Sequence, residues 1–461
     1  MDLFSDSEFD DQDNTEEPIG PDDLDRSKPL VLLLGNVDHE GITSQLKAGG
    51  EQYKKKILAS TMGNWQSILK YFDEFAIRAV VIKLNGNVYD LLDRPEYLYV
   101  GKLLFSRIAK VRHIAFVFQS LLSGKPTPDR ELFWPVSADV GAKVNCLLQE
   151  YGLNVVPYKT NAELTVVATE FLKDAIEQLL FRVYVPTGRL WANELDRLLQ
   201  LFRDYLLQTG RKGVRLEQTR TDRGIAYEFH GDYSAESPSL SQDFQDFSHF
   251  LDLCVSDPKQ AEELLKQKSV NAREVFEILA RYSKEAKRLQ IDLKHDRERK
   301  LLNIRQRLES ELTDSLPGPQ DWVLINRLVD GAVPGAVIDN AYALGQDSNL
   351  IHPQPKPQFT VNLNPQIINT VNGLVAHEIS GNINLSENDQ ELLALIREHG
   401  GSRAVELTSA VHELSDPGIP KPTRLSGAQR LKAFLYAIGP KLGGVATNVL
   451  QEYIEHKIGL K

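Results

Sequence analysis

Small polar side chains follow two apolar runs near the N-terminus, at residues 30–34 and 79–84. Such side chains can bind a ribose or a phosphate, because ligands of an open parallel sheet bind beyond the carboxyl ends of its strands. The same residue types also serve ordinary turns, and we favour that interpretation for each of them taken singly. The candidate cofactor-binding residues are Asn36, Asp38, Asn85 and Asn87, and the sequence leaves the cofactor unknown.

Glu96 is the nearest candidate for a catalytic carboxylate. The order of strands and helices around it is similar to that of TIR-like NAD-cleaving domains, which would need a glutamate on the helix after the central strand. The residues that flank Glu96 match no motif that we can name, so the resemblance is one of fold order alone. It implies a nucleotide such as NAD as the substrate.

A receiver-type phosphorylation site would need clustered acids after the first strand and an aspartate at the end of the third. Asp38 and Glu40 meet the first requirement, but Leu84 is followed by Asn85, so we reject this site. The other catalytic motifs are absent from the sequence. It contains no G-x-G-x-x-G, no G-x-x-x-x-G-K-[ST], no H-E-x-x-H and no G-x-S-x-G. The sequence therefore favours a protein without catalysis, with a nucleotide-utilising enzyme as the alternative.

A basic stretch at residues 281–307 holds ten Lys/Arg against four acids. Nucleic acid is one possible partner for such a stretch. We favour the solvated face of a long helix, because aromatic residues are not interleaved with the cations. A further interpretation is that the acidic N-terminal segment binds this stretch.

Charge is distributed unevenly along the 461 residues, whose net charge is −11. Residues 1–28 carry eleven acids and two basic residues, so the remainder is nearly neutral and the first segment is expected to be a disordered acidic tail. The sequence contains no apolar run of the length that a membrane span needs. Two distant cysteines indicate a reducing cytoplasm and no structural metal.

Strands and helices alternate over residues 29–180, which predicts a Rossmann-like α/β domain with an open, mainly parallel sheet. Residues 181–315 predict an α+β module: a strand, a helix, a hairpin and a long charged helix over 272–312. That helix has a heptad-like apolar seam, typical of a coiled coil. The seam needs a partner, and its own module and a second copy of the chain are equally good candidates.

The remaining chain is expected to contain three segments. Residues 316–358 predict an irregular stretch, with strands near residue 333, and a Pro-rich linker. Residues 359–385 predict Asn/Gly-rich strands, and residues 386–461 a helical bundle. Capping boxes are expected at Ser386 and at Ser426, where Gln429 would complete the second box.

This architecture favours a cytoplasmic signalling or scaffold protein that associates through its long helix and C-terminal modules, with the α/β domain as sensor or effector. Protein partners or self-association are expected, a nucleotide is possible, nucleic acid is the less favoured partner, and no membrane is involved.

Overall fold

The computed structural model describes residues 24–37, 41–123, 136–211, 213–232, 240–268, 272–313, 319–336, 365–381, 385–442 and 444–458. Asp38 and Glu40, the expected Pro-rich linker at 346–358 and the first residues of the expected strand segment lie outside these ranges. Residues 24–28, expected in the disordered tail, are held by the α/β domain. Leu24 is buried in its core, and the backbone N–H of Asp25 donates to Oε1 of Gln52 (2.8 Å).

A five-stranded parallel sheet forms the centre of the N-terminal domain, as the alternation of elements predicts. Its strand order is β2-β1-β3-β4-β5, the doubly wound order in which β2 lies on one side of β1 and the later strands follow on the other side, so that the switch point lies between β1 and β3. All five residues of β1 are buried, because both faces of this sheet are covered by helices. The strands are β1 (Leu30–Leu34), β2 (Gln52–Lys56), β3 (Ile77–Leu84), β4 (His113–Phe118) and β5 (Val155–Tyr158).

Strand β2 has the sequence Gln-Tyr-Lys-Lys-Lys, whose polar residues hide it from an apolar pattern. Helices α1 and α7 contact each other, and α2, α3, α4 and α6 form a second connected group. The helices of this domain are α1 (Ile42–Ala48), α2 (Met62–Glu74), α3 (Gly86–Leu92), α4 (Pro95–Ile108), α5 (Gln119–Ser123), α6 (Ala138–Glu150) and α7 (Asn161–Ile176).

The middle module is built on an antiparallel sheet of order β6-β8-β7. Aromatic side chains from α8, α9 and α11 form its core, with Phe202 against Phe244 and Tyr205 against Phe247. Its elements are β6 (Leu179–Pro186), α8 (Ala192–Gln208), β7 (Arg215–Arg220), β8 (Gly224–His230), α9 (Leu240–Ser256), α10 (Pro258–Gln267) and α11 (Ala272–Leu312).

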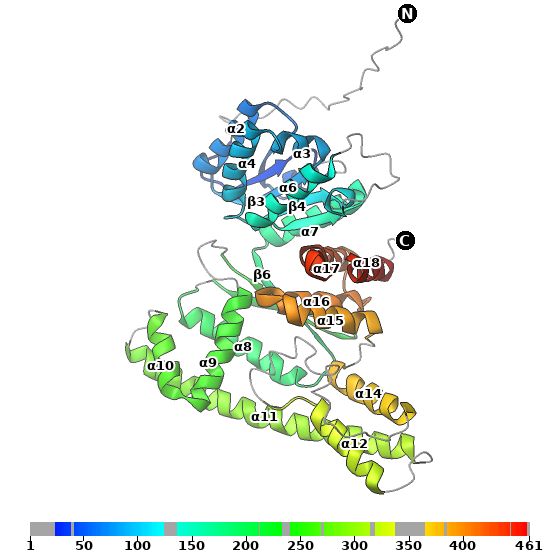
Figure 1. Cartoon of the computed structure of the whole chain (residues 1–461). Coiled ribbons are helices and arrows are strands. Elements are labelled where there is room, and N and C mark those ends of the chain that lie inside the picture. The colour runs from blue at the N-terminus through cyan, green and yellow to red at the C-terminus, as the bar shows by residue number, and fades with distance from the viewer. Residues whose placement is uncertain are drawn as a thin grey trace, which may run out of the picture.

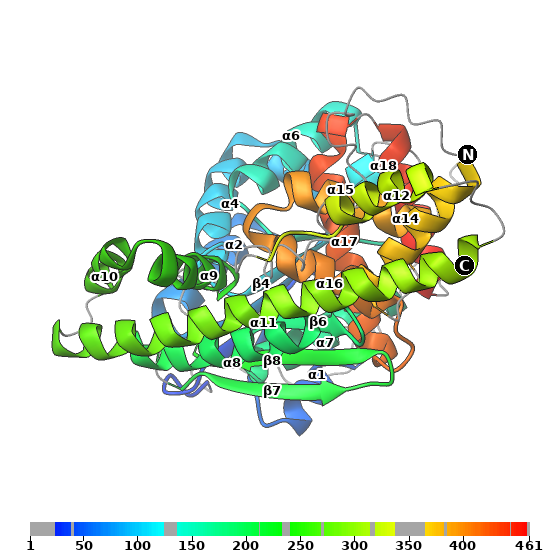
Figure 2. The same cartoon turned by 90° about the horizontal axis from the view of Figure 1, so that it is seen from below.

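Helix α11 has the expected bounds, and its apolar seam is buried within the chain. Tyr282, Leu289 and Leu293 are fully buried in the same core as α8 and α9. Seen from below, α11 crosses the molecule with α9 and α10 at one end and α12 and α14 at the other (Figure 2). The seam therefore packs against its own module and not against a second copy of the chain.

Two expectations for the segment after α11 are wrong. Helix α12 (Pro319–Ala332) lies in the stretch expected to be irregular, and helix α14 (Pro365–Ser380) replaces the expected strands. Val371, Val375 and Ile379 are buried on α14 at intervals of four. Positions four apart on a helix also fit the two-residue alternation of a strand. The buried residues of a helix therefore gave the pattern from which strands were expected.

The C-terminal bundle comprises α15 (Glu387–His399), α16 (Ala404–Leu414), α17 (Lys421–Leu442) and α18 (Gly444–Ile458). The capping box at Ser386 is confirmed, with Asp389 as its second member. The second box is wrong, because α17 runs without interruption through Ser426. Gln429 is buried and donates to Glu163 of α7 instead.

The C-terminal helices lie between the other two parts of the molecule. Figure 1 shows α17 and α18 beneath the α/β domain and α16 above the middle module. Helix α17 contacts β5 and α7, and α16 contacts β6. Apolar residues of α15 to α18 belong to the core of the α/β domain, so they join a domain far away in sequence. None of the described helices combines the length and apolarity that crossing a membrane requires.

Candidate functional site at the carboxyl edge of the parallel sheet

Asn85 lies after β3, where the sequence places it, and it caps helix α3. Its side-chain oxygen accepts a hydrogen bond from the backbone N–H of Val88 (3.1 Å). Asparagine is a preferred N-cap residue because this oxygen satisfies a donor that the first helical turn leaves free. The turn interpretation of Asn85 is therefore the one that the geometry supports.

The other sequence candidates are exposed. Asn36 follows β1, Asn87 lies in the first turn of α3, and Glu96 lies in the first turn of α4. Burial and a charged neighbour are what usually adapt a carboxylate to catalysis. The Glu96 side chain is exposed, and it forms no ion pair with any of the described residues. Asp38 lies outside the described residues.

Two lysines, neither identified from the sequence, lie at this edge of the sheet. Nζ of Lys83, on β3, donates to Oδ1 of Asn161 (2.8 Å) and lies 5.4 Å from the ring centre of Tyr158. Lys159 is the first residue after β5, and its Nζ donates to Oε2 of Glu455 on α18 (2.6 Å). The local sequence shows only that Lys159 is a cation after a strand. Its partner Glu455 is 296 residues away, so no local pattern indicates the pair.

Glu163 connects the start of α7 to the same cluster. Its backbone N–H donates to Oγ1 of Thr160 (3.2 Å), and its carboxylate accepts from the backbone N–H of Lys159 (2.9 Å). The remaining interactions run to α17, from Gln429 and from Lys432, whose Nζ lies 3.5 Å from Oε1 of Glu163. The start of α7 is therefore fixed by its own cap and by the C-terminal bundle together.

Lys432 is the buried centre of this cluster. Its side chain has no exposed surface, and its Nζ lies 3.1 Å from Oε1 of Glu455. Burial acts to raise the pKa of Glu455, but the Lys159 hydrogen bond and the Lys432 charge outweigh it and hold that pKa below its ordinary value. Two carboxylates and two ammonium groups therefore form one network between the sheet edge and α17–α18.

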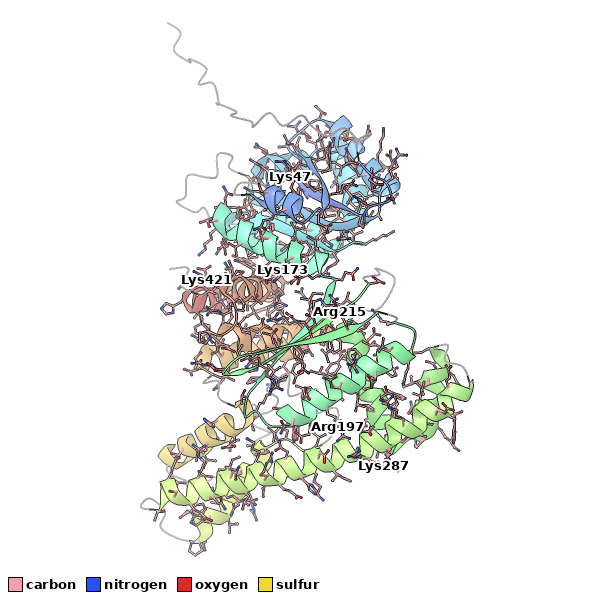
Figure 3. All side chains as sticks on the ribbon, turned by 180° about the vertical axis from the view of Figure 1, so that it is seen from behind. Lys47, Lys173, Arg197, Arg215, Lys287 and Lys421 are labelled. Atoms are coloured by element: carbon pink, nitrogen blue, oxygen red, sulfur yellow. The ribbon has the colours of Figure 1, made fainter. Side chains whose placement is uncertain are left out.

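The basic helix α11 is largely engaged within the chain. Eight of its ten cations between residues 281 and 307 have a carboxylate or carbonyl partner in the structure. Carboxylates of α11 also bind outward, since Arg197 on α8 pairs with Asp292 (2.8 Å). Figure 3 marks Arg197 and, on α11, Lys287. These pairings favour the interpretation of a solvated, ion-paired helix face.

No protein-family model, curated protein or solved structure matches this chain.

Proposed function

We propose that the chain is a regulatory or scaffold protein whose α/β domain senses an anionic ligand, such as a nucleotide, at the carboxyl edge of its sheet. The observation that carries this proposal is the ion pair between Lys159 and Glu455. Lys159 lies at the carboxyl end of the edge strand β5, on the side of the sheet where ligands of such sheets bind, and Glu455 belongs to a helix of the C-terminal bundle.

The chemistry of the pair supports a competition between ligand and helix. A phosphate group at the edge would require cations, and Lys83 and Lys159 are two of the cations that the described residues place there. The Lys159 side chain is 45% exposed and the Glu455 side chain 4%, so a ligand can reach the lysine while the carboxylate stays inside. Lys432 would keep Glu455 paired after Lys159 has turned to the ligand. Binding would therefore loosen one of the links that hold α18.

The alternative of a nucleotide-utilising enzyme, for example one that cleaves NAD, has less support. Asn85 is used as a helix cap, and Glu96 is exposed and has no ion pair or hydrogen bond among the described residues. Association through the α11 seam also loses support, since that seam is filled. We propose that protein partners or a second copy bind outer surfaces instead, such as α4, where Tyr99 (68% exposed) and Leu103 (43%) lie one turn apart.

The test is thermal denaturation of the full chain with ATP, GTP, NAD and cyclic nucleotides. A ligand that binds the folded state raises the melting temperature. We expect a rise in the wild type, a smaller rise in Lys159→Met, and a larger one in Glu455→Gln, because that change releases Lys159. Lys143→Met is the matched control, since Lys143 forms an exposed pair with Asp93 elsewhere in the domain.

An equal shift in the wild type and in Lys159→Met, or no shift with any of these ligands, would contradict the sensor proposal. Nicotinamide release from NAD that disappears in Glu96→Gln would favour the enzyme alternative. A mass in solution that falls when Tyr99 and Leu103 are both changed to Ser would support association through α4.

A further inference from the structure

Two glutamates face each other across the β7–β8 hairpin of the middle module. Glu217 on β7 and Glu228 on β8 are direct cross-strand partners in the register. Like charges in this arrangement destabilise a sheet unless a cation compensates them. The pair therefore requires positive charge from its surroundings.

His230 lies two residues after Glu228 on β8, so the two side chains are on the same face of the sheet. Three potential metal ligands lie close together here. One carboxylate oxygen each of Glu217 and Glu228 and a ring nitrogen of His230 are within 4.8 Å of one another. The His230 side chain is only 5% exposed. Its imidazole is therefore held in the protein and directed at the carboxylates, and it does not turn freely in solvent.

The hydrogen bond of the other ring nitrogen selects the tautomer of His230. Nδ1 lies 2.9 Å from the backbone carbonyl oxygen of Glu177, which can only accept, so Nδ1 carries the hydrogen. In the neutral ring, the lone pair is then on Nε2. This nitrogen is buried without a hydrogen-bond partner among the described residues, and it lies 4.0 Å from Oε2 of Glu217. Histidines that bind metals are typically held this way, with the second ring nitrogen on a carbonyl.

Two arginines lie beside the cluster and do not fill it. Arg182 on β6 pairs with Glu228 and donates through Nε to Oε1 of Glu413 on α16 (3.0 Å). Arg215, labelled in Figure 3, lies on the edge strand β7; its Nε is 3.4 Å from Oε1 of Glu217, and its side chain is 64% exposed. A guanidinium could donate to the neutral Nε2, but this nitrogen has no hydrogen-bond partner among the described residues. The arginines therefore compensate the carboxylates and leave the lone pair of Nε2 available for a cation.

We propose that Glu217, Glu228 and His230 form a binding site for a first-row divalent cation, with Zn²⁺ as the ion that fits best. One imidazole and two carboxylates give three protein ligands and leave a fourth position for water, as in open zinc sites. Mg²⁺ and Ca²⁺ take oxygen ligands and gain nothing from the imidazole. Zinc bonds of about 2.0–2.2 Å require the three side chains to approach one another. Glu217, 54% exposed, has the freedom to do so.

The test is isothermal titration of the chelator-treated full chain with Zn²⁺ and, separately, with Mg²⁺. We expect zinc binding that Glu217→Gln weakens at least tenfold and that His230→Asn weakens at least as much. Asparagine at 230 keeps a donor near Nδ1 for the Glu177 carbonyl and removes Nε2. Asp222→Asn, in the turn of the same hairpin, is the matched control and should leave the affinity unchanged.

Circular dichroism of each variant checks that the fold is intact. Because Glu217 is exposed, its variant is expected to fold even if His230→Asn does not. Zinc affinity that is the same in Glu217→Gln as in the wild type would overturn the proposal, and so would the absence of zinc binding. Equal binding of Mg²⁺ and Zn²⁺ would also overturn it, since the imidazole would then contribute nothing.

Discussion

The ammonium nitrogen of Lys432 on α17 lies 3.1 Å from a carboxylate oxygen of Glu455 on α18, with no part of the lysine side chain exposed. The same ammonium is 3.5 Å from Glu163 on α7. One buried cation thus joins the C-terminal bundle to the α/β domain. A buried ion pair adds little net stability, because both charges lose their hydration. Removing only the cation is costly, because it leaves buried carboxylates uncompensated.

Lys432→Met is expected to lower the free energy of unfolding by about 3–5 kcal/mol, because it leaves two buried carboxylates without their shared cation. Urea denaturation followed by tryptophan fluorescence measures this, since Trp65 is buried in the α/β core. Lys143→Met, which breaks an exposed pair with Asp93, is the control and should change stability little. Equal effects of the two changes would show that the buried network is not what fixes the bundle.

Asp174, near the end of α7, should make stability depend on pH. Burial, with a smaller contribution from Glu170, raises the pKa of Asp174 to about 6. Between its ordinary value of 3.8 and about 6, the folded state holds a proton that the unfolded state has lost. The contribution of Asp174 to stability therefore falls as pH rises through this window, and it no longer changes above it.

Asp174→Asn removes this dependence. Relative to the wild type, the variant should gain stability from pH 4 to pH 7 by up to about 3 kcal/mol, at 1.36 kcal/mol for each pKa unit. Urea midpoints at both pH values test the expectation. Glu150→Gln, an exposed change in α6, is the control. A difference between variant and wild type that does not change with pH would refute the raised pKa.

The seam of α11 gives a prediction about assembly. Leu289 is fully buried in the core shared with α8 and α9, and Ile291 is 54% exposed. Leu289→Ala should cost about 2–5 kcal/mol, as for other buried leucines, and Ile291→Ala much less. Because the seam is filled within the chain, the mass of folded Leu289→Ala in light scattering should equal that of the wild type. Dissociation of a dimer by this change would instead place the seam between two copies.

Local patterns predicted most of the fold, and their failures have identifiable causes. Helix α11 has the expected bounds because a seam over 41 residues has an unambiguous period. Val371, Val375 and Ile379 fit a spacing of two and a spacing of four, and only the packing of α14 against α11 and α12 decides between them. Sequence spacing alone does not show which long-range partner will complete a packing surface.

The candidate site was predictable only in its location. The carboxyl ends of the strands follow from the alternation of elements, and Asn85 lies there. Its role as a cap, and the pairing of Lys159 with Glu455, depend on neighbours that the local pattern does not contain. Glu163 likewise has the sequence of an ordinary first-turn acid, but its carboxylate faces Gln429 and Lys432 of α17. Side chains that join distant parts of a chain give no periodic signal.

Gly35, directly after β1, should not tolerate a side chain. Its φ is +84°, and an added Cβ would lie 2.4 Å from the carbonyl oxygen of Lys83, a backbone atom of the neighbouring strand. Gly210, two residues after the end of α8, has φ +98°, but an added Cβ there would have nothing within 4 Å. Gly210→Ala should therefore cost only the left-handed strain, about 1–2 kcal/mol. Gly35→Ala adds a clash that requires β1 and β3 to separate, and its loss of stability in urea denaturation should exceed that of Gly210→Ala. Equal losses would show that the sheet can relax around the added methyl group. The carboxyl edge of the sheet would then be less rigid than the strand pairing indicates.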